Sequence, residues 1–406
     1  MKPMSTSTDS THSSKENKSN RGKKLDGSLS FIPDDVIFYE IFPRLPVKSL
    51  HRFRCIARSF CGLTSERKFL DAVRRYGPRR QLISFPRLLP LEIDLYHADF
   101  AVSPYGLGAI PTTAIQDPFT NRCIYINIIN GFMCRSNESR NVVIMNNATN
   151  EVSILPNYEP PLRCEQHYVY FVYDPHTDIY KVMRTVMFRT GTGSTTALMR
   201  YSIFTLGYQI WVCFDHPGLR QYGNSRSVCI DGILYLNKFC EDCGRHVMGL
   251  YSVEDDAFSS MLYPNGLCQS KYDDCHLIEI NGSLAIIDIH FIMADGITLW
   301  RKKKGSMLND ESSWVEQRIN FPMDWGKSHR ICARYYFSNN LNGEIVMGKT
   351  SILEGNNCWI LICNVDNETW REIRVSGIVN QVICGDLRVV EYVETPLLLS
   401  QISHPK

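Results

Sequence analysis

The sequence predicts an α+β protein with more than one domain: a short module of three helices followed by an all-β propeller of about six blades. Three observations carry this prediction. Apolar residues between Phe31 and Tyr76 recur at spacings of three and four, as on one face of a helix. From Gln81 onward, short runs of Val, Ile, Tyr, Phe and Leu alternate with Gly, Asn, Asp and Pro, which is typical of many short strands. Turn motifs in the C-terminal half repeat roughly every 50–60 residues, the spacing of four-stranded blades.

The composition excludes some classes of protein and divides the charge unevenly. The 406 residues include 44 Lys and Arg against 42 Asp and Glu, for a net charge of +2, and 44% are apolar. These values exclude a wholly disordered chain and a strongly basic nucleic-acid-binding protein. Residues 31–80 hold eleven basic and five acidic side chains, or +6, whereas residues 81–406 hold 27 and 34, or −7. The short module is therefore expected to meet an acidic partner.

Residues 1–28 are expected to form a disordered polar and basic tail, because they have too few apolar side chains to offset the entropy lost on ordering. Lys15–Lys24 could act as a weak nuclear import signal, but a solvated tail is favoured. No secretory signal is visible, and Asp288, His290 and Asp295 interrupt the most apolar stretch, Leu284–Trp300. The expected compartment is the nucleus, the cytoplasm or both, without membrane contact.

Residues 29–76 are predicted to form the helical module. Pro33 and Asp34 favour a helix start, because Pro lacks the N–H that would be unpaired there and the helix dipole stabilises acidic residues. Pro46 ends the first helix and begins the second, and Gly62 is expected to end the second. So small a core is only marginally stable alone, and such helices usually dock on a partner. The predicted apolar faces are Phe38, Ile41, Phe42 and Leu45; Val47, Leu50, Phe53, Ile56 and Phe60; and Phe69, Ala72, Val73 and Tyr76.

Two kinds of hairpin recur after Gln81. Asn-Gly and Asp-Gly supply the positive φ that tight hairpins need. Hairpins of this kind are predicted at Cys229–Leu236, Glu279–Ile287 and Asn340–Gly348. A looser turn, Asp/Asn-x-x-Thr/Asp, is predicted at Ile115–Ile126, Val143–Leu155, Phe171–Met183, Leu250–Leu262 and Ile362–Val375. The Trp residues expected mainly in the blade cores are Trp211, Trp300, Trp314, Trp359 and Trp370.

The sequence favours no metal site, no cofactor and no catalytic centre. A zinc site is conceivable, but with fifteen Cys a chance C-x-x-C is unsurprising, and no second one is present. The cysteines are expected to be free thiols. No spacing indicates the base that a catalytic Cys would need. The zinc ligands would be Cys240, Cys243, His246, Cys268, Cys275 and His276.

Two further stretches could bind nucleotides or nucleic acids. Gly191–Thr196 lacks the following Lys and the strand-to-helix context of a phosphate-binding loop, so a hairpin loop is favoured. The basic run Arg74-Arg75 and Arg79-Arg80 is interpreted as the exposed end of the third helix, because no aromatic platform accompanies it. No nucleic-acid partner is therefore expected.

Ile32–Phe69 closely resembles an F-box, above all in the ungapped run Arg44–Phe60 (RLPVKSLHRFRCIARSF). Phe60 stands where the family usually has Trp, and Phe42-Pro43 replaces its usual Leu-Ser type pair. The remainder resembles the F-box-associated interaction domain of the large plant F-box/kelch-like family. The matching stretches are Gly131–Cys134, Val143–Pro156, Phe171–Arg184, Ser227–Leu236, Gly296–Lys304, Ser313–Pro322 and Val390–Leu399.

The resemblance implies an F-box in residues 29–76 and a kelch-like, target-binding propeller in residues 77–400. It implies the substrate-recognition subunit of a Skp–cullin–F-box (SCF) ubiquitin ligase. The F-box would dock the Skp adaptor and, through it, the cullin and RING subunits. The propeller would hold an unknown target protein for ubiquitination and proteasomal degradation. The chain would not be an enzyme, since it would only bring a target lysine near the ubiquitin thioester.

Two other functions stay open at this point. The chain could be a scaffold that binds the adaptor or a partner without ubiquitin transfer. A propeller enzyme such as a glycan hydrolase would need a pair of carboxylates in the channel, and the repeats show none. No residue is assigned to the target. The resemblance assigns adaptor docking or the local core to Ile32, Pro33, Asp34, Val36, Ile41, Leu45, Pro46, Val47, Leu50, Phe53, Arg54 and Ile56.

Overall fold

The computed structural model of the chain describes most of the sequence after the tail. The predicted tail 1–28 lies outside it, as do the loop predicted at Gly191–Thr196 and most of the turn motif at Ile115–Ile126. The described ranges are 32–56, 58–86, 93–98, 112–114, 123–137, 141–157, 164–189, 197–208, 210–216, 219–221, 227–240, 245–267, 275–288, 296–306, 310–322, 334–351, 357–375 and 388–402.

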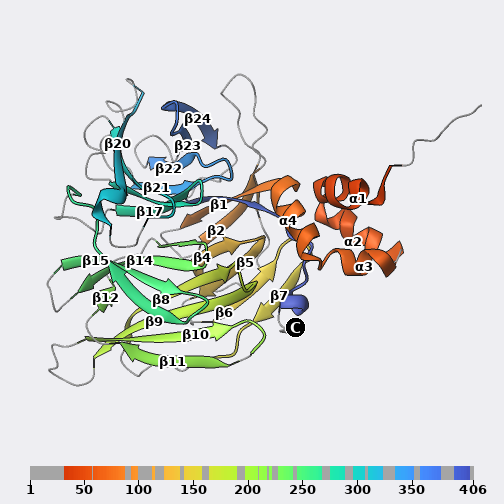
Figure 1. Cartoon of the computed structure of the whole chain (residues 1–406), viewed down its shortest axis with the longest axis horizontal. Coiled ribbons are helices and arrows are strands. Elements are labelled where there is room, and N and C mark those ends of the chain that lie inside the picture. The colour runs from red at the N-terminus through yellow and green to blue at the C-terminus, as the bar shows by residue number, and fades with distance from the viewer. Residues whose placement is uncertain are drawn as a thin grey trace, which may run out of the picture.

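The N-terminal residues 32–76, called the helical module below, form short helical segments beside the sheets (Figure 1). The predicted helix starts after Pro33 and Pro46 are confirmed. The Pro46 carbonyl accepts hydrogen bonds from the N–H groups of Ser49 (2.8 Å) and Leu50 (3.2 Å). The segments are α1 (Asp34–Val36), the π-helical turn η1 (Ile37–Ile41), the 3-10 turn η2 (Phe42–Arg44), α2 (Val47–Ile56), α3 (Arg58–Leu63) and α4 (Arg67–Tyr76).

The described helical residues that directly follow Pro46 are α2 and α3, and α3 ends at Leu63, one residue beyond Gly62, where the second helix was predicted to end. Glycine costs a helix only about 1 kcal/mol relative to alanine, which burial of a neighbouring side chain can offset. Leu63 is buried in the core of the helical module, so the helix extends just far enough to place this side chain there.

After the helical module, the strands form six antiparallel sheets among the described residues, five with four strands and one with five. The sheets, each given in spatial order, are β25 (Arg388–Val393), β1 (Arg79–Pro86), β2 (Ile93–Ala98), β3 (Thr112–Ala114); β4 (Cys123–Ile129), β5 (Phe132–Asn137), β6 (Val142–Asn146), β7 (Glu151–Ile154); β8 (Cys164–Asp174), β9 (Ile179–Arg189), β10 (Ala197–Thr205), β11 (Trp211–His216); β12 (Leu219–Gln221) and β13 (Ser227–Ile230) beside β14 (Ile233–Cys240), β15 (Arg245–Ser252), β16 (Ala257–Met261); β17 (Cys275–Ile280), β18 (Ser283–Asp288), β19 (Gly296–Lys302), β20 (Trp314–Asn320); and β21 (Arg334–Asn339), β22 (Ile345–Ser351), β23 (Asn357–Asn364), β24 (Thr369–Val375). Two short helices, η5 (Glu311–Ser313) and α6 (Leu399–Ile402), complete the described elements.

The innermost strands of the sheets follow one another around a central channel, as in a β-propeller. Strand β4 lies against β8, β8 against β13, β13 against β17, β17 against β21, β21 against β25, and β25 against β4. The last strand of the chain thus joins the sheet of the first strands, with Val390 of β25 opposite Leu82 of β1. Closure of this kind ties the two ends of the fold together. The predicted order of short helices followed by a β-propeller is confirmed.

The predicted turn chemistry is confirmed for the described motifs. Each four-residue turn ends on a residue with positive φ: Asn150 (59°), Asp178 (58°), Asp256 (53°) and Glu368 (56°). The hairpins Asp231-Gly232 (51° and 78°) and Asn281-Gly282 (52° and 74°) have positive φ at both turn residues, as type I′ turns require. Short polar residues and Gly therefore set the register of the strands through local backbone geometry.

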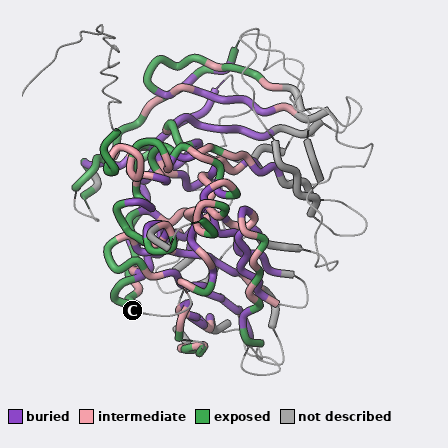
Figure 2. The backbone as a smooth tube through the Cα atoms, turned by 90° about the vertical axis from the view of Figure 1, so that its right-hand side faces the viewer, coloured by how far each residue is buried: buried purple, intermediate pink, exposed green. Residues whose placement is uncertain are grey.

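The core lies between neighbouring sheets, and buried residues follow the strands in Figure 2. The predicted positions of the five Trp residues are confirmed, because each packs against a buried cluster between sheets. No helix in the described ranges is long and apolar enough to span a membrane. The cysteines found as free thiols are Cys55, Cys61, Cys134, Cys213, Cys229, Cys275 and Cys363.

Candidate functional site

The helical module is held together by a small core of its own. Leu50, Leu63, Phe69 and Val73 are 0–6% exposed and pack together. Half-buried side chains, among them Leu45, surround this cluster. Val73 and Phe69 come from α4, so this helix closes the core from the side of the propeller (Figure 1). The core is therefore thin and depends on α4 staying in place.

Four phenylalanines of the helical module form a half-buried aromatic cluster: Phe38, Phe42, Phe53 and Phe60. The Phe42 and Phe53 rings are stacked, with centroids 5.1 Å apart and planes 16° apart. Phe60 lies 5.3 Å from Phe42 and 5.9 Å from Phe38. Aromatic pairs in this range add about 0.5–1.5 kcal/mol beyond area burial. The cluster shapes a rigid apolar surface from η1, η2, α2 and α3.

Three isoleucines of the helical module, called the outer apolar set below, remain in solvent. Ile32 is 50% exposed, Ile41 40% and Ile56 76%. Pro33, Asp34 and Pro46 are also exposed, whereas Val36, Leu45, Phe53 and Arg54 are half-buried. Apolar side chains left in water on a small module indicate a surface that another protein covers.

Two of the residues assigned to adaptor docking or the local core lie in the core. Val47 is 1% exposed and Leu50 is 2% exposed. Both lie on the buried side of α2, because they follow the helical period that faces the core of the module. Their side chains support the fold and offer no surface to a partner in this arrangement.

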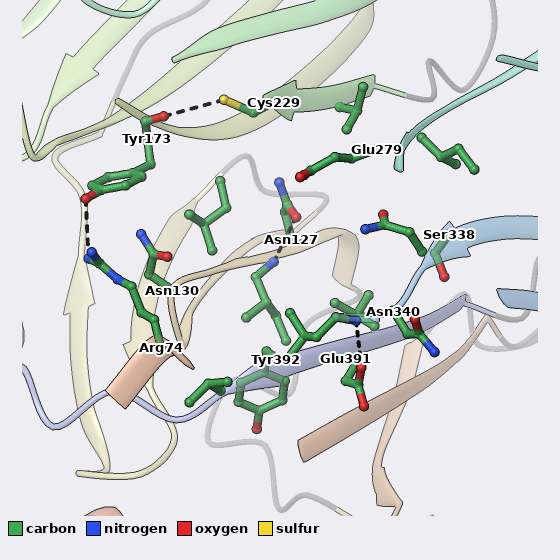
Figure 3. A pocket seen from close by; sticks show the side chains of 18 of the residues that line it. Arg74, Asn127, Asn130, Tyr173, Cys229, Glu279, Ser338, Asn340, Glu391 and Tyr392 are labelled. Carbon is green, nitrogen blue, oxygen red and sulfur yellow. Dashed lines mark hydrogen bonds between the residues drawn. The ribbon is translucent and has the colours of Figure 1, made fainter. Parts of the chain in front are cut away.

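Helix α4 also fastens the helical module to the propeller. Leu70 is buried in a propeller cluster with Phe132 and Ile144. Arg67 Nη2 donates to the Pro175 carbonyl (2.5 Å) in the turn after β8. Arg74 Nη2 donates to the Tyr173 hydroxyl (3.3 Å), a contact visible in Figure 3. The module and the propeller therefore share an apolar contact flanked by hydrogen bonds.

The basic run at the end of α4 faces the propeller as well. Arg79 Nη1 donates to Asn342 Oδ1 (2.5 Å), and Arg80 Nε lies 3.2 Å from Glu394 Oε1. Arg75 is exposed. The interpretation of this run as the exposed end of a helix holds for Arg75, but Arg74 is half-buried, and Arg79 (exposed) and Arg80 (half-buried) lie in β1 rather than in the helix.

A cavity of about 440 Å³ opens into the channel where α4 meets the sheets (Figure 3). Its wall is built from the C-terminal halves of β4, β13, β17, β21 and β25, with Tyr173 from β8. Helix α4 contributes Leu70, Val73 and Arg74. The propeller thus has a preformed hollow that touches the helical module.

Burial changes the acid–base behaviour of two groups on this wall. It raises the pKa of the Glu279 carboxyl, and Asp231 raises it further, while the Gly282 N–H and Lys304 oppose the shift. Burial also raises the pKa of the Cys229 thiol to about 12, so this thiol stays protonated near neutral pH. Cys229 donates a hydrogen bond to the Tyr173 carbonyl (3.6 Å). A protonated, buried thiol is a poor nucleophile.

The metal-ligand hypothesis finds no geometric support in the described residues. There, no group of three or more His, Cys, Asp or Glu side chains is arranged to hold a metal ion. Cys243 and Cys268, two of the suggested zinc ligands, lie outside those ranges.

Comparison with known proteins identifies the propeller. The family model described as "F-box associated beta propeller domain" matches residues 109–395, more than half of the chain. The chain belongs to this family of F-box-associated propellers.

Relatives in sequence agree with this assignment. An F-box protein of Arabidopsis thaliana is 27% identical over 331 residues, covering 75% of each chain. A second Arabidopsis F-box protein is 22% identical over 377 residues, covering 86% of this chain and 91% of its own. The WD40 domain of SCAP from fission yeast has 9% identity and a TM-score of 0.34, covering 78% of this chain and 96% of its own, a likeness too weak to carry an argument.

This F-box-associated propeller has two features that the sequence did not reveal. One is the contact between α4 and the sheets, and the other is the cavity beside it. The Arg-rich run from the end of α4 into β1 was a usable signal for the contact, since four Arg in seven residues need acceptors. The cavity left no signal, because its wall combines residues from six separate sheets and a helix.

Proposed function

We propose that this F-box-associated propeller is the substrate-recognition subunit of an SCF ubiquitin ligase. The helical module binds the Skp adaptor and, through it, cullin and the RING subunit. The propeller binds a target protein, which is ubiquitinated and degraded. The chain itself breaks and forms no bonds, and it acts by holding the target lysine near the ubiquitin-charged enzyme.

One observation carries the proposal. The outer apolar set stays exposed although α4 and the propeller already cover the other side of the helical module. Burying one such side chain in an interface stabilises a complex by about 1.5–3 kcal/mol before the costs of association. Lys48 and Arg52 are also exposed, on the same helix as Ile56. An adaptor with an apolar groove and an acidic rim matches this surface.

The rigid contact of α4 adds a second argument. A recognition subunit has to hold its target at a fixed place relative to the ubiquitin-charged enzyme. Leu70, Arg67 and Arg74 connect the adaptor-binding side to the sheets without a free linker. An effective concentration set by a rigid connection exceeds that of a flexible tether that samples many positions.

We also infer that the propeller has six blades, one for each sheet. The cycle of contacts between the first strands supports this count. The likeness to kelch propellers in particular stays a prediction.

Affinity capture with mass spectrometry tests the adaptor. The full chain, the double variant Ile41→Glu/Ile56→Glu and the control Ile210→Glu/Val212→Glu are compared. Ile210 and Val212 are 68% and 62% exposed on the propeller, so the control adds the same charges away from the module. We expect adaptor and cullin with the wild type and the control, and a loss of at least about tenfold with the double variant.

Recovery of adaptor by the double variant equal to wild type would contradict the proposed docking surface. The turnover of co-purified proteins is then followed with and without cullin activity. Turnover that needs cullin supports the ligase. Adaptor binding without any cullin-dependent turnover would support the scaffold instead.

A further inference from the structure

The cavity beside α4 has the size and construction of a small-molecule site. Its volume of about 440 Å³ falls within the roughly 300–1,000 Å³ typical of ligand pockets. Its wall comes mainly from the innermost strand of each sheet, which is hydrogen-bonded to the next strand of the same sheet. A pocket of this kind is preformed, so a ligand would not have to order the chain on binding.

One part of the wall is apolar. Leu70 and Val73 come from α4, and Ile128, Val228 and Phe337 come from three different first strands. Leu70, Val73 and Phe337 are 2–6% exposed, so each offers the cavity only the edge of a packed side chain. This part of the wall would contact the apolar part of a ligand.

The charged part of the wall is acidic. Four carboxylates, those of Asp231, Glu279, Glu391 and Glu394, face one guanidinium, that of Arg74. Arg74 is already engaged by Asp71 (2.8 Å) and by the Tyr173 hydroxyl. The wall therefore attracts cations and repels anions.

Two of the four carboxylates are occupied within the protein. Glu391 accepts hydrogen bonds from Gln81 Nε2 (3.0 Å) and from the Leu341 N–H (2.7 Å). Glu394 lies 3.2 Å from Arg80 Nε. A ligand that used either carboxylate would have to displace these donors.

Of the remaining two, Glu279 is better placed than Asp231. The side chain of Asp231 is 72% exposed and lies 3.7 Å from His176, so solvent weakens its field. The Glu279 carboxylate is half-buried and points toward the centre of the cavity in Figure 3. It accepts a hydrogen bond from the Gly282 N–H. Burial raises the pKa of Glu279, which means that its charged form gains from a nearby cation.

Asn130, at the end of β4, lies beside Arg74 and away from Glu279 in Figure 3, and it donates its amide N–H to the Tyr180 hydroxyl (3.1 Å). It therefore does not share a ligand group with Glu279. An ammonium group has three donors and no acceptor. The Glu279 carboxylate on the cavity wall is the complement of such a group.

We propose that this cavity binds a small amphipathic amine, with Glu279 receiving the ammonium group and the Leu70, Val73 and Phe337 side chains receiving its apolar body. The site lies between the helical module and the propeller, so the ligand would contact both. This inference is independent of the proposed ligase function, because it concerns the channel and leaves the outer apolar set untouched.

The test uses the full chain and two probes of similar shape and opposite charge. Phenethylamine carries a phenyl ring and an ammonium group, and hydrocinnamate carries the same ring and a carboxylate. Calorimetry and thermal unfolding are measured for the wild type, Glu279→Gln and Glu316→Gln. Glu316 is exposed on β20 and lies outside the cavity, so it controls for the loss of one carboxylate.

We expect the wild type and Glu316→Gln to bind phenethylamine with a Kd of about 1 mM or tighter, as suits so small a ligand. Glu279→Gln should weaken binding at least about tenfold, because it removes a charge-assisted hydrogen bond. An unchanged Tm of free Glu279→Gln would show that the fold is intact. Absence of phenethylamine binding to the wild type, equal binding by Glu279→Gln, or equal binding of hydrocinnamate would overturn the proposal.

Discussion

The helical module buries four apolar side chains in its central cluster, whereas the largest clusters of the propeller bury ten to fourteen each. The surfaces differ in the opposite sense. Ile32, Ile41, Ile56 and Tyr76 are four of the twelve large apolar side chains that are exposed in the described residues, although the module is a small part of them. In the propeller, apolar side chains therefore mainly stabilise the interior. In the helical module, a larger share of the apolar side chains lies on the surface and is open to contacts. The module is stable because α4 lies on the sheets and, in the proposed complex, because an adaptor covers its other side.

The largest effect is expected when one buried aromatic ring is removed from each region, which tests whether the module has the weaker core. Phe69 in the module and Phe132 in the propeller are both 0% exposed. Either change to Ala costs about 3–5 kcal/mol. In Phe69→Ala this loss of free energy exceeds the stabilisation that a thin core supplies. The amides of α2 and α4 should therefore lose protection against hydrogen exchange, while those of the sheets stay protected. Phe132→Ala should lower Tm but leave both regions folded. Hydrogen exchange with mass spectrometry measures both effects, and equal protection of α2 in the two variants would refute the contrast.

A second test concerns a buried polar pair inside the propeller and measures how much its replacement by apolar side chains stabilises the fold. Lys238 of β14 is 1% exposed and donates to the Tyr201 hydroxyl (3.2 Å). Burial lowers the pKa of Lys238 to about 7. Replacing both partners, in Lys238→Met/Tyr201→Phe, should stabilise the propeller at pH 7 by about 1–4 kcal/mol. Tyr201→Phe alone should destabilise it, because Lys238 loses an acceptor.

The sign of the pH dependence follows from the lowered pKa. Between about pH 7 and its ordinary pKa of 10.5, the unfolded chain binds a proton at Lys238 that the folded chain lacks. The stability of the wild type should therefore rise with pH across this window because of Lys238. The double variant lacks that contribution, so its advantage should be largest at or below pH 7 and shrink toward pH 10.5. Urea unfolding at several pH values measures it, and a constant advantage would contradict the assignment.

A third test concerns the turns at the channel. Gly343 has φ +74°, and a Cβ there would lie 2.1 Å from Asn281 Oδ1. Gly305 has φ +76° with open space around it. Gly305→Ala should cost about 1–2 kcal/mol from backbone strain alone. Gly343→Ala should cost more, because the neighbouring turn must also move. An equal decrease in the free energy of unfolding for both variants, measured with denaturant, would show that the turn at Asn281 moves at little cost.

The smallest expected effect is at the junction of the two regions. Arg74→Leu removes the ion pair with Asp71 and the hydrogen bond to Tyr173, and should cost only about 0.5–1 kcal/mol because the side chain is 31% exposed. Arg371→Leu, which breaks a pair with Glu344 (2.6 Å) inside the propeller, serves as the matched control. Exchange in α4 should rise only in Arg74→Leu. Equal exchange in both variants would place the anchoring in Leu70 and Arg67.

Local patterns in the sequence predicted a large part of the fold. Pro33 and Pro46 marked helix starts, and Asp231-Gly232 and Asn281-Gly282 marked hairpins, because each acts through its own backbone dihedrals. Gly62 marked the end of the helical stretch to within one residue, since α3 ends at the buried Leu63. Patterns of this kind report on neighbours in the chain.

The candidate sites were predicted less completely. The outer apolar set was identified with its module, but the sequence could not separate Ile41 and Ile56 on the surface from Val47 and Leu50 in the core. All four follow the same helical period, and only the packing of α3 and α4 decides which side is covered.

The sequence by itself determined the order of helices and strands, the turn positions and the membership of the F-box-associated family, since these depend on residues close together in the chain. Only the tertiary structure decided that α4 lies on the channel, that Arg74 of α4 meets Tyr173 while Arg79 and Arg80 of β1 meet Asn342 and Glu394, and that Glu279 faces a cavity. The physical reason is the sequence distance: Arg79 and Asn342 are 263 residues apart, and only closure of the ring brings such groups within hydrogen-bonding reach.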